Sequence, residues 1–155
     1  RRERMPEVDG LWVSPLMRCR QTAELLFPGM EQHIVPDLQE CDFGDYECKT
    51  WEELKDEEIY RAWIGGDMTI TFPHGESMEH FIARCRRGIQ TVAQEAKAMG
   101  LQRPAIVAHG GTWLVVMGTF GRPERKLYDW QVKNCGGFRV SVQENPFTLK
   151  LLEEL

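Results

Sequence analysis

The chain has 155 residues, of which 42% are hydrophobic and 28% charged, values that fit one globular domain with one core. Its net charge of −5 and its pI of about 5.4 argue against a nucleic-acid partner, because nucleic-acid binders carry a basic surface. No apolar run approaches the roughly 20 residues that cross a bilayer, and no signal peptide is visible, so no membrane partner is predicted and a cytoplasmic location is expected.

The five cysteines support a reducing compartment. They are scattered, odd in number and without a Cys-x-x-Cys pair, which argues against a disulfide framework and against a zinc site. Each is expected to be a small buried or half-buried hydrophobic residue.

The N-terminal part of the chain is predicted to alternate strands and helices. Residues 11–13 are a short apolar run typical of a buried strand. A helix is expected over residues 14–26, with Ser14 as its N-cap and a Pro in its first turn. A second strand is predicted over residues 33–35, and the aperiodic residues 38–49 are expected to form a structured loop.

The middle of the chain carries two helical patterns. Residues 50–64 begin with a capping box, a Thr followed three residues later by a Glu, and end before two glycines. The stronger helix starts near Glu76 or Ser77, because apolar residues recur from there at spacings of three and four. Gly100 is a natural C-cap for this helix.

The C-terminal third predicts a buried strand, a helix and a hairpin. Residues 104–108 are fully apolar, and His109 with the two glycines after it predicts a tight turn that leads into a helix over residues 112–120. Residues 138–142 and 147–152 are predicted to pair around an Asn-Pro turn. Apolar strands that alternate with helices favour an α/β fold, with three α/β/α layers around a mostly parallel sheet.

Two predicted strand ends carry side chains that suit an anion, and sites in such sheets form at the carboxyl ends of the strands. His109 precedes a helix N-terminus, so its ring can hydrogen-bond a phosphate oxygen while the glycine at Gly110 lets a ligand approach closely. Arg18 lies one turn inside the helix after the first strand and can hold a phosphate through two parallel hydrogen bonds. Taken singly, this His is equally well a turn residue, and this Arg fits a solvated helix face better.

Two acidic segments are candidates for proton transfer. The loop at residues 38–47 holds four acids among aromatic residues, and Glu40 in a partly desolvated loop is suited to donate a proton to a leaving oxygen. An ordinary surface loop with ionised acids is the alternative. Glu76 and Ser77 open the long helix, and for them a capping role is the better interpretation.

Taken together, these segments resemble the motifs of the histidine phosphatase superfamily, also called phosphoglycerate mutase-like, and they follow one another in the same order as in that family. Residues 14–23 resemble the family's Ser-Pro-Leu-x-Arg-x-x-Gln-Thr-Ala. Residues 38–48 resemble its Leu-x-Glu-x-x-Phe-Gly-x-Trp-Glu-Gly, with Tyr in place of Trp and Cys48 in place of the last Gly. Further matches are Gly-Glu-Ser at residues 75–77, Ala-His-Gly-Gly at residues 108–111 and Asn-Cys at residues 134–135.

The resemblance implies a phosphoric monoester hydrolase that works through a phosphohistidine intermediate, without metal or cofactor. By motif match, the catalytic residues would be Glu40, which protonates the leaving alcohol, and His109, which stabilises the transferring group. Arg18, His109 and Gly110 would bind the phosphate. The implied partner is a small phosphorylated metabolite, and a homodimer is left open. The short interval after the acid loop favours a small phosphatase of the family, such as an α-ribazole-5′-phosphate phosphatase of cobalamin biosynthesis.

The family's Arg-His-Gly motif, which carries the nucleophilic histidine, does not occur in this sequence, and no His precedes His33. We therefore interpret residues 1–155 as a single histidine phosphatase domain without its N-terminal segment and first strand, and expect this fragment alone to be inactive. A phosphoglycerate mutase, or a non-catalytic module that binds phosphorylated ligands or other proteins, is the alternative. Cys48, in place of a Gly, leaves open the backbone conformation of the acid loop.

Substrate choice would depend on the side chains around the leaving group. Candidates for an apolar leaving-group pocket are Trp51, Tyr60, Trp63, Met68 and Trp113. Tyr60 and Trp63 stand at helical spacing, which is more typical of a packed core.

Overall fold

The computed structural model describes residues 5–155. Contacts divide the chain into two compact units, one made of Arg1–Glu40 and Cys85–Leu155 and the other of Cys41–Arg84. Within residues 5–155, every helix is too short or too polar to span a bilayer.

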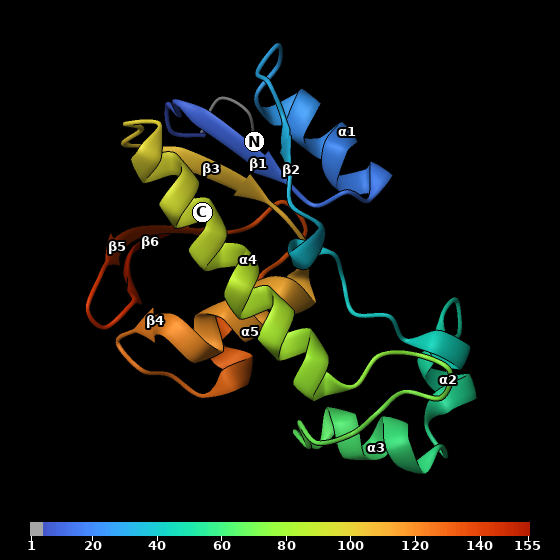
Figure 1. Cartoon of the computed structure of the whole chain (residues 1–155). Helices are drawn as coiled ribbons and strands as arrows, with labels where there is room; N and C mark the ends of the chain where they lie inside the picture. Colours follow the sequence, from blue (N-terminus) through green and yellow to red (C-terminus); the bar gives the residue numbers. More distant parts are fainter. Residues whose placement is uncertain (1–4) are drawn as a thin grey trace. The chain divides into compact units, whose positions relative to one another are not determined.

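The first unit is built on a parallel sheet of three strands (Figure 1). Strand β1 (Gly10–Val13) pairs with β2 (His33–Ile34) on one side and with β3 (Pro104–Val107) on the other. All residues of β1 are buried, as expected of a strand that is covered on both faces. The predicted α/β class with a mostly parallel sheet is confirmed.

Helices cover both faces of this sheet, because successive residues of a strand point to opposite sides. Leu11 and Val13 pack on helix α1 (Met17–Leu26), which is drawn in blue in Figure 1. Trp12 packs on the C-terminal part of helix α4 (Met78–Ala98). The short strand β1 is therefore the layer between two helices.

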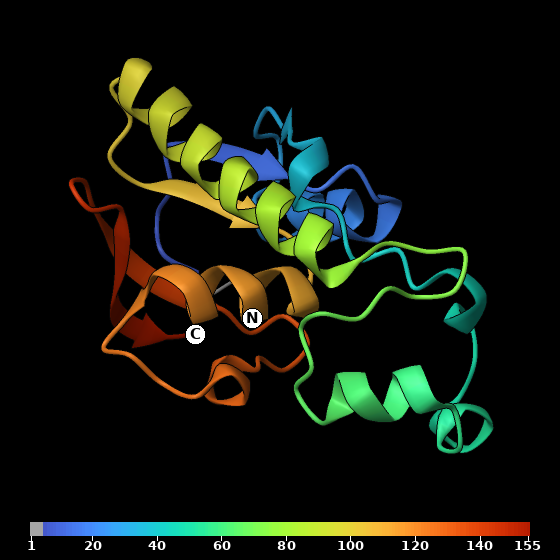
Figure 2. The same cartoon turned by 60° about the horizontal axis from the view of Figure 1, so that its bottom comes forward.

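A second sheet follows helix α5 (Gly110–Phe120). In this sheet β4 (Gly121–Arg122) runs parallel to β6 (Thr148–Glu154), and β5 (Phe138–Gln143) pairs antiparallel with β6. The predicted hairpin is thus confirmed, with each strand ending one or two residues later than expected. Figure 2 shows the hairpin beside α5.

Strand β3 is the last strand of the first sheet, and one of its edges pairs with β1. Among the described residues no strand pairs with its other edge, and residues 105–107 stay half-buried although β3 is apolar. Residues of β3 and of the β5–β6 hairpin line one cavity of about 630 Å³. The first unit therefore contains an apolar space next to an open strand edge.

The second unit packs around aromatic rings. Its helices α2 (Trp51–Leu54) and α3 (Glu58–Ile64) replace the single helix predicted for this region. The predicted capping box is present, with the backbone N of Thr50 donating to Glu53 Oε2 at 2.8 Å. The rings in mutual contact belong to Phe43, Tyr46, Tyr60, Trp63 and Phe72. Short 3-10 helices in the two units span Pro36–Leu38, Gly44–Tyr46 and Leu127–Trp130.

Two predicted helix starts are wrong, and both lie at strand ends. Helix α1 begins at Met17 with Leu16 as N-cap, because the backbone N of Ser14 still donates to Val107 O in the sheet, at 3.0 Å. Helix α5 begins at Gly110, so the glycines expected in a turn form its first turn. In both places the backbone stays extended beyond the end of the strand, up to the residue before the helix.

Candidate active site

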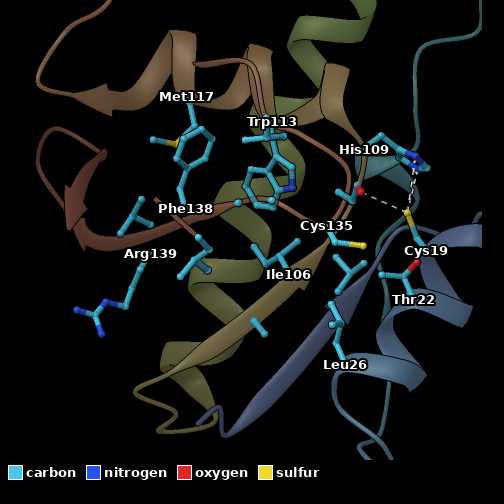
Figure 3. A pocket seen from close by; sticks show the side chains of 18 of the residues that line it. Cys19, Thr22, Leu26, Ile106, His109, Trp113, Met117, Cys135, Phe138 and Arg139 are labelled. Carbon is cyan, nitrogen blue, oxygen red and sulfur yellow. Dashed lines mark hydrogen bonds between the residues drawn. The ribbon is translucent and has the colours of Figure 1, made fainter. Parts of the chain in front are cut away.

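The predicted site residues meet where β1 and β3 end. Ser14 and the N-cap residue His109 come one and two residues after these parallel strands, and Arg18 lies in the first turn of α1. Arg18, Glu40, His109 and Gly110 all line the cavity of about 630 Å³. Figure 3 shows His109 next to a side chain of α1 at this cavity. The structure thus brings together every residue that the motifs proposed for the site.

Three side chains hold the imidazole ring of His109, which is only 6% exposed. The hydroxyl of Ser14 lies 2.7 Å from Nε2, and Nε of Arg18 donates to Nδ1 at 3.3 Å. The sulfur of Cys19 lies 3.4 Å from Nε2 and packs along the ring. The ring is therefore fixed in orientation, which a turn histidine bonded to backbone would not need.

Cys19 is a neutral neighbour of this ring. Its thiol donates to the carbonyl O of Ala108 at 3.4 Å, a contact drawn in Figure 3. Burial raises the pKa of the Cys19 thiol, and the nearby Arg18 opposes this only in part. The thiol therefore stays protonated at neutral pH and adds no negative charge beside an anion.

Glu40 is held by the first turn of α5. The backbone N of Gly111 donates to Glu40 Oε2 at 3.4 Å. A Cβ on Gly111 would lie 2.5 Å from Glu40 Oε1, so a residue with a side chain cannot occupy this position without moving the carboxylate. The buried hydroxyl of Thr112 donates to Leu38 O at 3.3 Å and fixes the segment that precedes Glu40.

Arg18 supplies a permanent positive charge to the cavity. Its side chain is exposed, yet its Nε points at the His109 ring rather than into bulk solvent. The N-terminus of α5 at Gly110 adds backbone N–H groups and the positive end of a helix dipole. A cation, an imidazole and a helix N-terminus together suit an oxyanion, and the carboxyl group of Glu40 lines the same space.

Glu76 lies in the second unit and has a structural partner. Its side chain is 9% exposed and accepts hydrogen bonds from Arg84 Nε at 2.7 Å and from His80 Nδ1 at 2.6 Å. Burial opposes ionisation, but Arg84 and His80 hold the pKa of Glu76 below its usual value. Of the two predicted caps it is Ser77 that caps α4, because its hydroxyl accepts from the backbone N of His80 at 3.1 Å, whereas Glu76 acts through this ion pair.

The acid loop contains a strained residue at the position where the family has Gly. Cys48 adopts a φ of 61°, in the left-handed region that favours glycine. The chain therefore adopts here, with a side chain present, a backbone conformation that glycine favours. Cys48 and Cys135 are exposed, which differs from the expectation that every cysteine is at least half-buried.

The aromatic candidates for a leaving-group pocket belong to both units of the chain. Trp113 lines the cavity of the first unit. Tyr60 and Trp63 belong to the aromatic core of the second unit, which their helical spacing favoured. Trp51 is 59% exposed.

Comparison with known proteins places the chain in a family. The profile of the histidine phosphatase superfamily (branch 1) matches residues 2–155, so the chain belongs to this superfamily. The adenosylcobalamin/α-ribazole phosphatase of Salmonella typhimurium is 30% identical over 149 residues, which are 93% of this chain and 72% of that protein. These similarities support assignment to the phosphatases.

Solved structures of phosphatases and mutases have folds similar to that of this chain. The α-ribazole phosphatase from Shigella flexneri has a TM-score of 0.72 and 28% sequence identity, over 94% of this chain and 73% of that chain. A phosphoglycerate mutase from Thermus thermophilus has a TM-score of 0.67 and 27% identity, over 97% of this chain and 74% of that chain. The histidine phosphatase fold predicted from the motifs is therefore confirmed.

The sequence does not predict which side chains and backbone groups contact His109 and Glu40. Ser14 was assigned to a helix cap, whereas its hydroxyl contacts His109. Gly111 and Thr112 were read as part of a turn and a helix, whereas both hold the Glu40 segment. A usable signal existed only for Ser14, because it follows a strand that pairs in parallel with the one before His109.

Proposed function

We propose that the protein is a metal-independent phosphomonoesterase that works through a phosphohistidine intermediate, with α-ribazole 5′-phosphate as the first substrate to test. One observation carries the proposal: Arg18, His109 and Glu40 line a single cavity in a member of the histidine phosphatase superfamily. The choice of substrate rests on the relatives and fold neighbours that are named α-ribazole phosphatases.

Arg18 and His109 act on the phosphoryl group. The guanidinium of Arg18 holds phosphate oxygens, and the ring of His109, with a second proton on Nδ1, donates a hydrogen bond from Nδ1 to the group as it transfers. Both side chains are already in contact, at 3.3 Å, before any substrate is bound. Little reorganisation is then needed when negative charge develops on the oxygens.

Glu40 moves the protons. As a carboxylic acid it gives its proton to the alkoxide oxygen when the phosphorus–oxygen bond breaks and the phosphoryl group passes to the nucleophilic histidine. As a carboxylate it then takes a proton from the water that attacks phosphohistidine, which releases inorganic phosphate and restores the acid. The half-buried position of Glu40 beside Gly111 suits both steps.

The nucleophile needs a place in the first unit. We propose that a further strand of the full-length protein, with the nucleophilic histidine at its end, occupies the part of this cavity that lies along β3 and leaves the part beside Arg18 and His109 open for the substrate. Support comes from the open edge of β3 and from the apolar side chains of Ile106, Phe138 and Val140 that line this space. A strand running parallel to β3 would end at the same edge of the sheet as His109.

The test uses the full-length product of the gene. Purified protein is incubated with EDTA and a panel of phosphate monoesters that includes α-ribazole 5′-phosphate and 3-phosphoglycerate, and inorganic phosphate is measured. We expect phosphate release from α-ribazole 5′-phosphate and an acid-labile phosphoenzyme in rapidly quenched samples. Isomerised phosphoglycerate without free phosphate would favour a mutase. Ligand binding without turnover, with no Arg-His-Gly in the full-length sequence, would favour a binding module.

A further inference from the structure

The side chain of Ser14 is placed with unusual firmness for a hydroxyl at a strand end. It is completely buried, and its backbone N donates to Val107 O at 3.0 Å, one residue beyond the last pair of β1 and β3. Its Oγ lies 2.7 Å from Nε2 of His109, the shortest contact described for that ring. The sheet therefore fixes the distance between this hydroxyl and the imidazole.

The contacts of the ring with Arg18 and Ser14 indicate where its proton lies. Nε of Arg18 always carries a hydrogen, so it can only donate to Nδ1 of His109, at 3.3 Å. Nδ1 must then present its lone pair, and the neutral ring carries its hydrogen on Nε2, directed at the Ser14 oxygen. The hydroxyl of Ser14 has the acceptor capacity that this arrangement requires.

We propose that Ser14 is a positioning residue that selects the Nε2–H tautomer of His109 and holds its ring ready for the phosphoryl group. A buried N–H without an acceptor costs about 1–3 kcal/mol, so removal of the hydroxyl favours rotation of the ring or a change of tautomer. Cys19, the neutral thiol on the same side, is too weak an acceptor to replace it. This role deepens the proposed function and rests on it for its effect on rate.

The test compares Ser14→Ala and Ser14→Thr in the full-length protein, with Ser141→Ala on β5 as a control that removes a hydroxyl outside the cavity lining. The imidazole ¹⁵N shifts of His109 are recorded, and the signal is assigned by its loss in His109→Asn. We expect one Nε2–H tautomer in the unchanged protein, a mixture in Ser14→Ala and recovery in Ser14→Thr. The turnover number should fall about 10-fold in Ser14→Ala, with KM within about twofold.

Each arm has a clear contrary result. An unchanged ¹⁵N signature in folded Ser14→Ala would overturn the proposal, as would a Ser141→Ala spectrum that changes in the same way. If Ser14→Ala does not fold, a shifted signature in folded Ser14→Thr that follows the moved hydroxyl supports the role, and an unshifted one opposes it. If the full-length protein turns over no phosphate ester, the proposed function fails, while the NMR result still decides the role of Ser14.

Discussion

His109 is surrounded by partners that come from one strand end and one helix. Ser14, Arg18 and Cys19 lie within five residues of one another in sequence and contact the same ring. This proximity explains why a short motif predicts so much of the candidate site: the residues proposed to hold the phosphate and those that contact His109 share one strand–helix connection. At this scale the proposed roles make separate predictions.

Replacement of His109 by Ala in the full-length protein should remove a group that stabilises charge on the transferring phosphoryl group. We expect the turnover number to fall by about 10²–10³-fold, the usual cost of losing such a donor. Steady-state phosphate release measures it, and circular dichroism checks that the variant is folded. Turnover close to that of the unchanged protein would remove His109 from the mechanism.

Replacement of Glu40 by Gln should affect substrates according to their leaving group. An alkyl phosphate needs a proton on its leaving oxygen, whereas an activated aryl phosphate leaves without one. The Gln variant should therefore lose much more activity on the alkyl ester than on p-nitrophenyl phosphate when phosphorylation is measured in the burst phase. An equal loss on both esters would argue that Glu40 is not the acid.

The motifs predicted the identity of these residues but not their contacts. Arg18 and His109 are 91 positions apart in sequence, and only the parallel pairing of β1 with β3 brings them within 3.3 Å. The sequence predicts a loop around Glu40 but not the path of its backbone. It predicts only a turn at Gly111, whose backbone N donates to Glu40 in the structure. Local patterns carry residue types, whereas tertiary hydrogen bonds decide which of these face one another.

Among the elements, the first turn of α5 contributes three neighbouring residues to the candidate site. It presents Gly110 to the cavity, holds Glu40 through Gly111 and fixes the preceding segment through the buried Thr112. A connection of only two residues, Ala108 and His109, joins β3 to α5, and the first backbone N–H groups of the helix are available because they have no partner within it. A side chain at position Gly111 would have to displace the Glu40 carboxylate.

Gly111→Ala should displace the Glu40 carboxylate, since the new Cβ would meet Oε1 at 2.5 Å. We expect at least about a tenfold loss of turnover with the helix intact, by analogy with the loss of groups that orient a catalytic residue. Gly137→Ala is the matched comparison, because its Cβ would meet no atom within 4 Å. A loss in Gly137→Ala as large as that in Gly111→Ala would contradict the proposed contact.

The Glu76–Arg84 pair should stabilise the second unit in a pH-dependent way. Because the pKa of Glu76 is lowered in the folded chain, its contribution is complete above the ordinary value of 4.5 and is lost as the pH falls through the folded value. Glu76→Gln should cost about 3 kcal/mol of unfolding free energy at pH 7, since it removes a charged partner of the buried Arg84 side chain.

Urea unfolding at pH 7 and at pH 3 measures this cost, and the difference between variant and unchanged protein should shrink at the lower pH. Asp37→Asn is the control, because the Asp37–Arg87 pair is largely exposed and should be worth less than about 1 kcal/mol. Equal costs for the two substitutions would show that burial does not strengthen the Glu76 pair.

For the whole molecule, periodicity predicted the class of fold and the order of most elements. The apolar runs over residues 11–13 and 104–108 and the stripe of α4 were sufficient, because a strand covered on both faces and a helix with one buried side leave strong patterns. The split of one predicted helix into α2 and α3, and the division of the chain into two compact units, left no such pattern. They depend on aromatic packing between residues that are distant in sequence.

The central claim is that Arg18, His109 and Glu40 act on one phosphoryl group in one cavity. The most direct measurement is a crystal structure of the full-length protein with vanadate, which adopts the geometry of a transferring phosphoryl group. The account predicts vanadate in this cavity, with its oxygens bonded by Arg18 and His109 and the Glu40 carboxyl facing the apical oxygen. Vanadate bound at another place, or Glu40 directed away from it, would contradict the account.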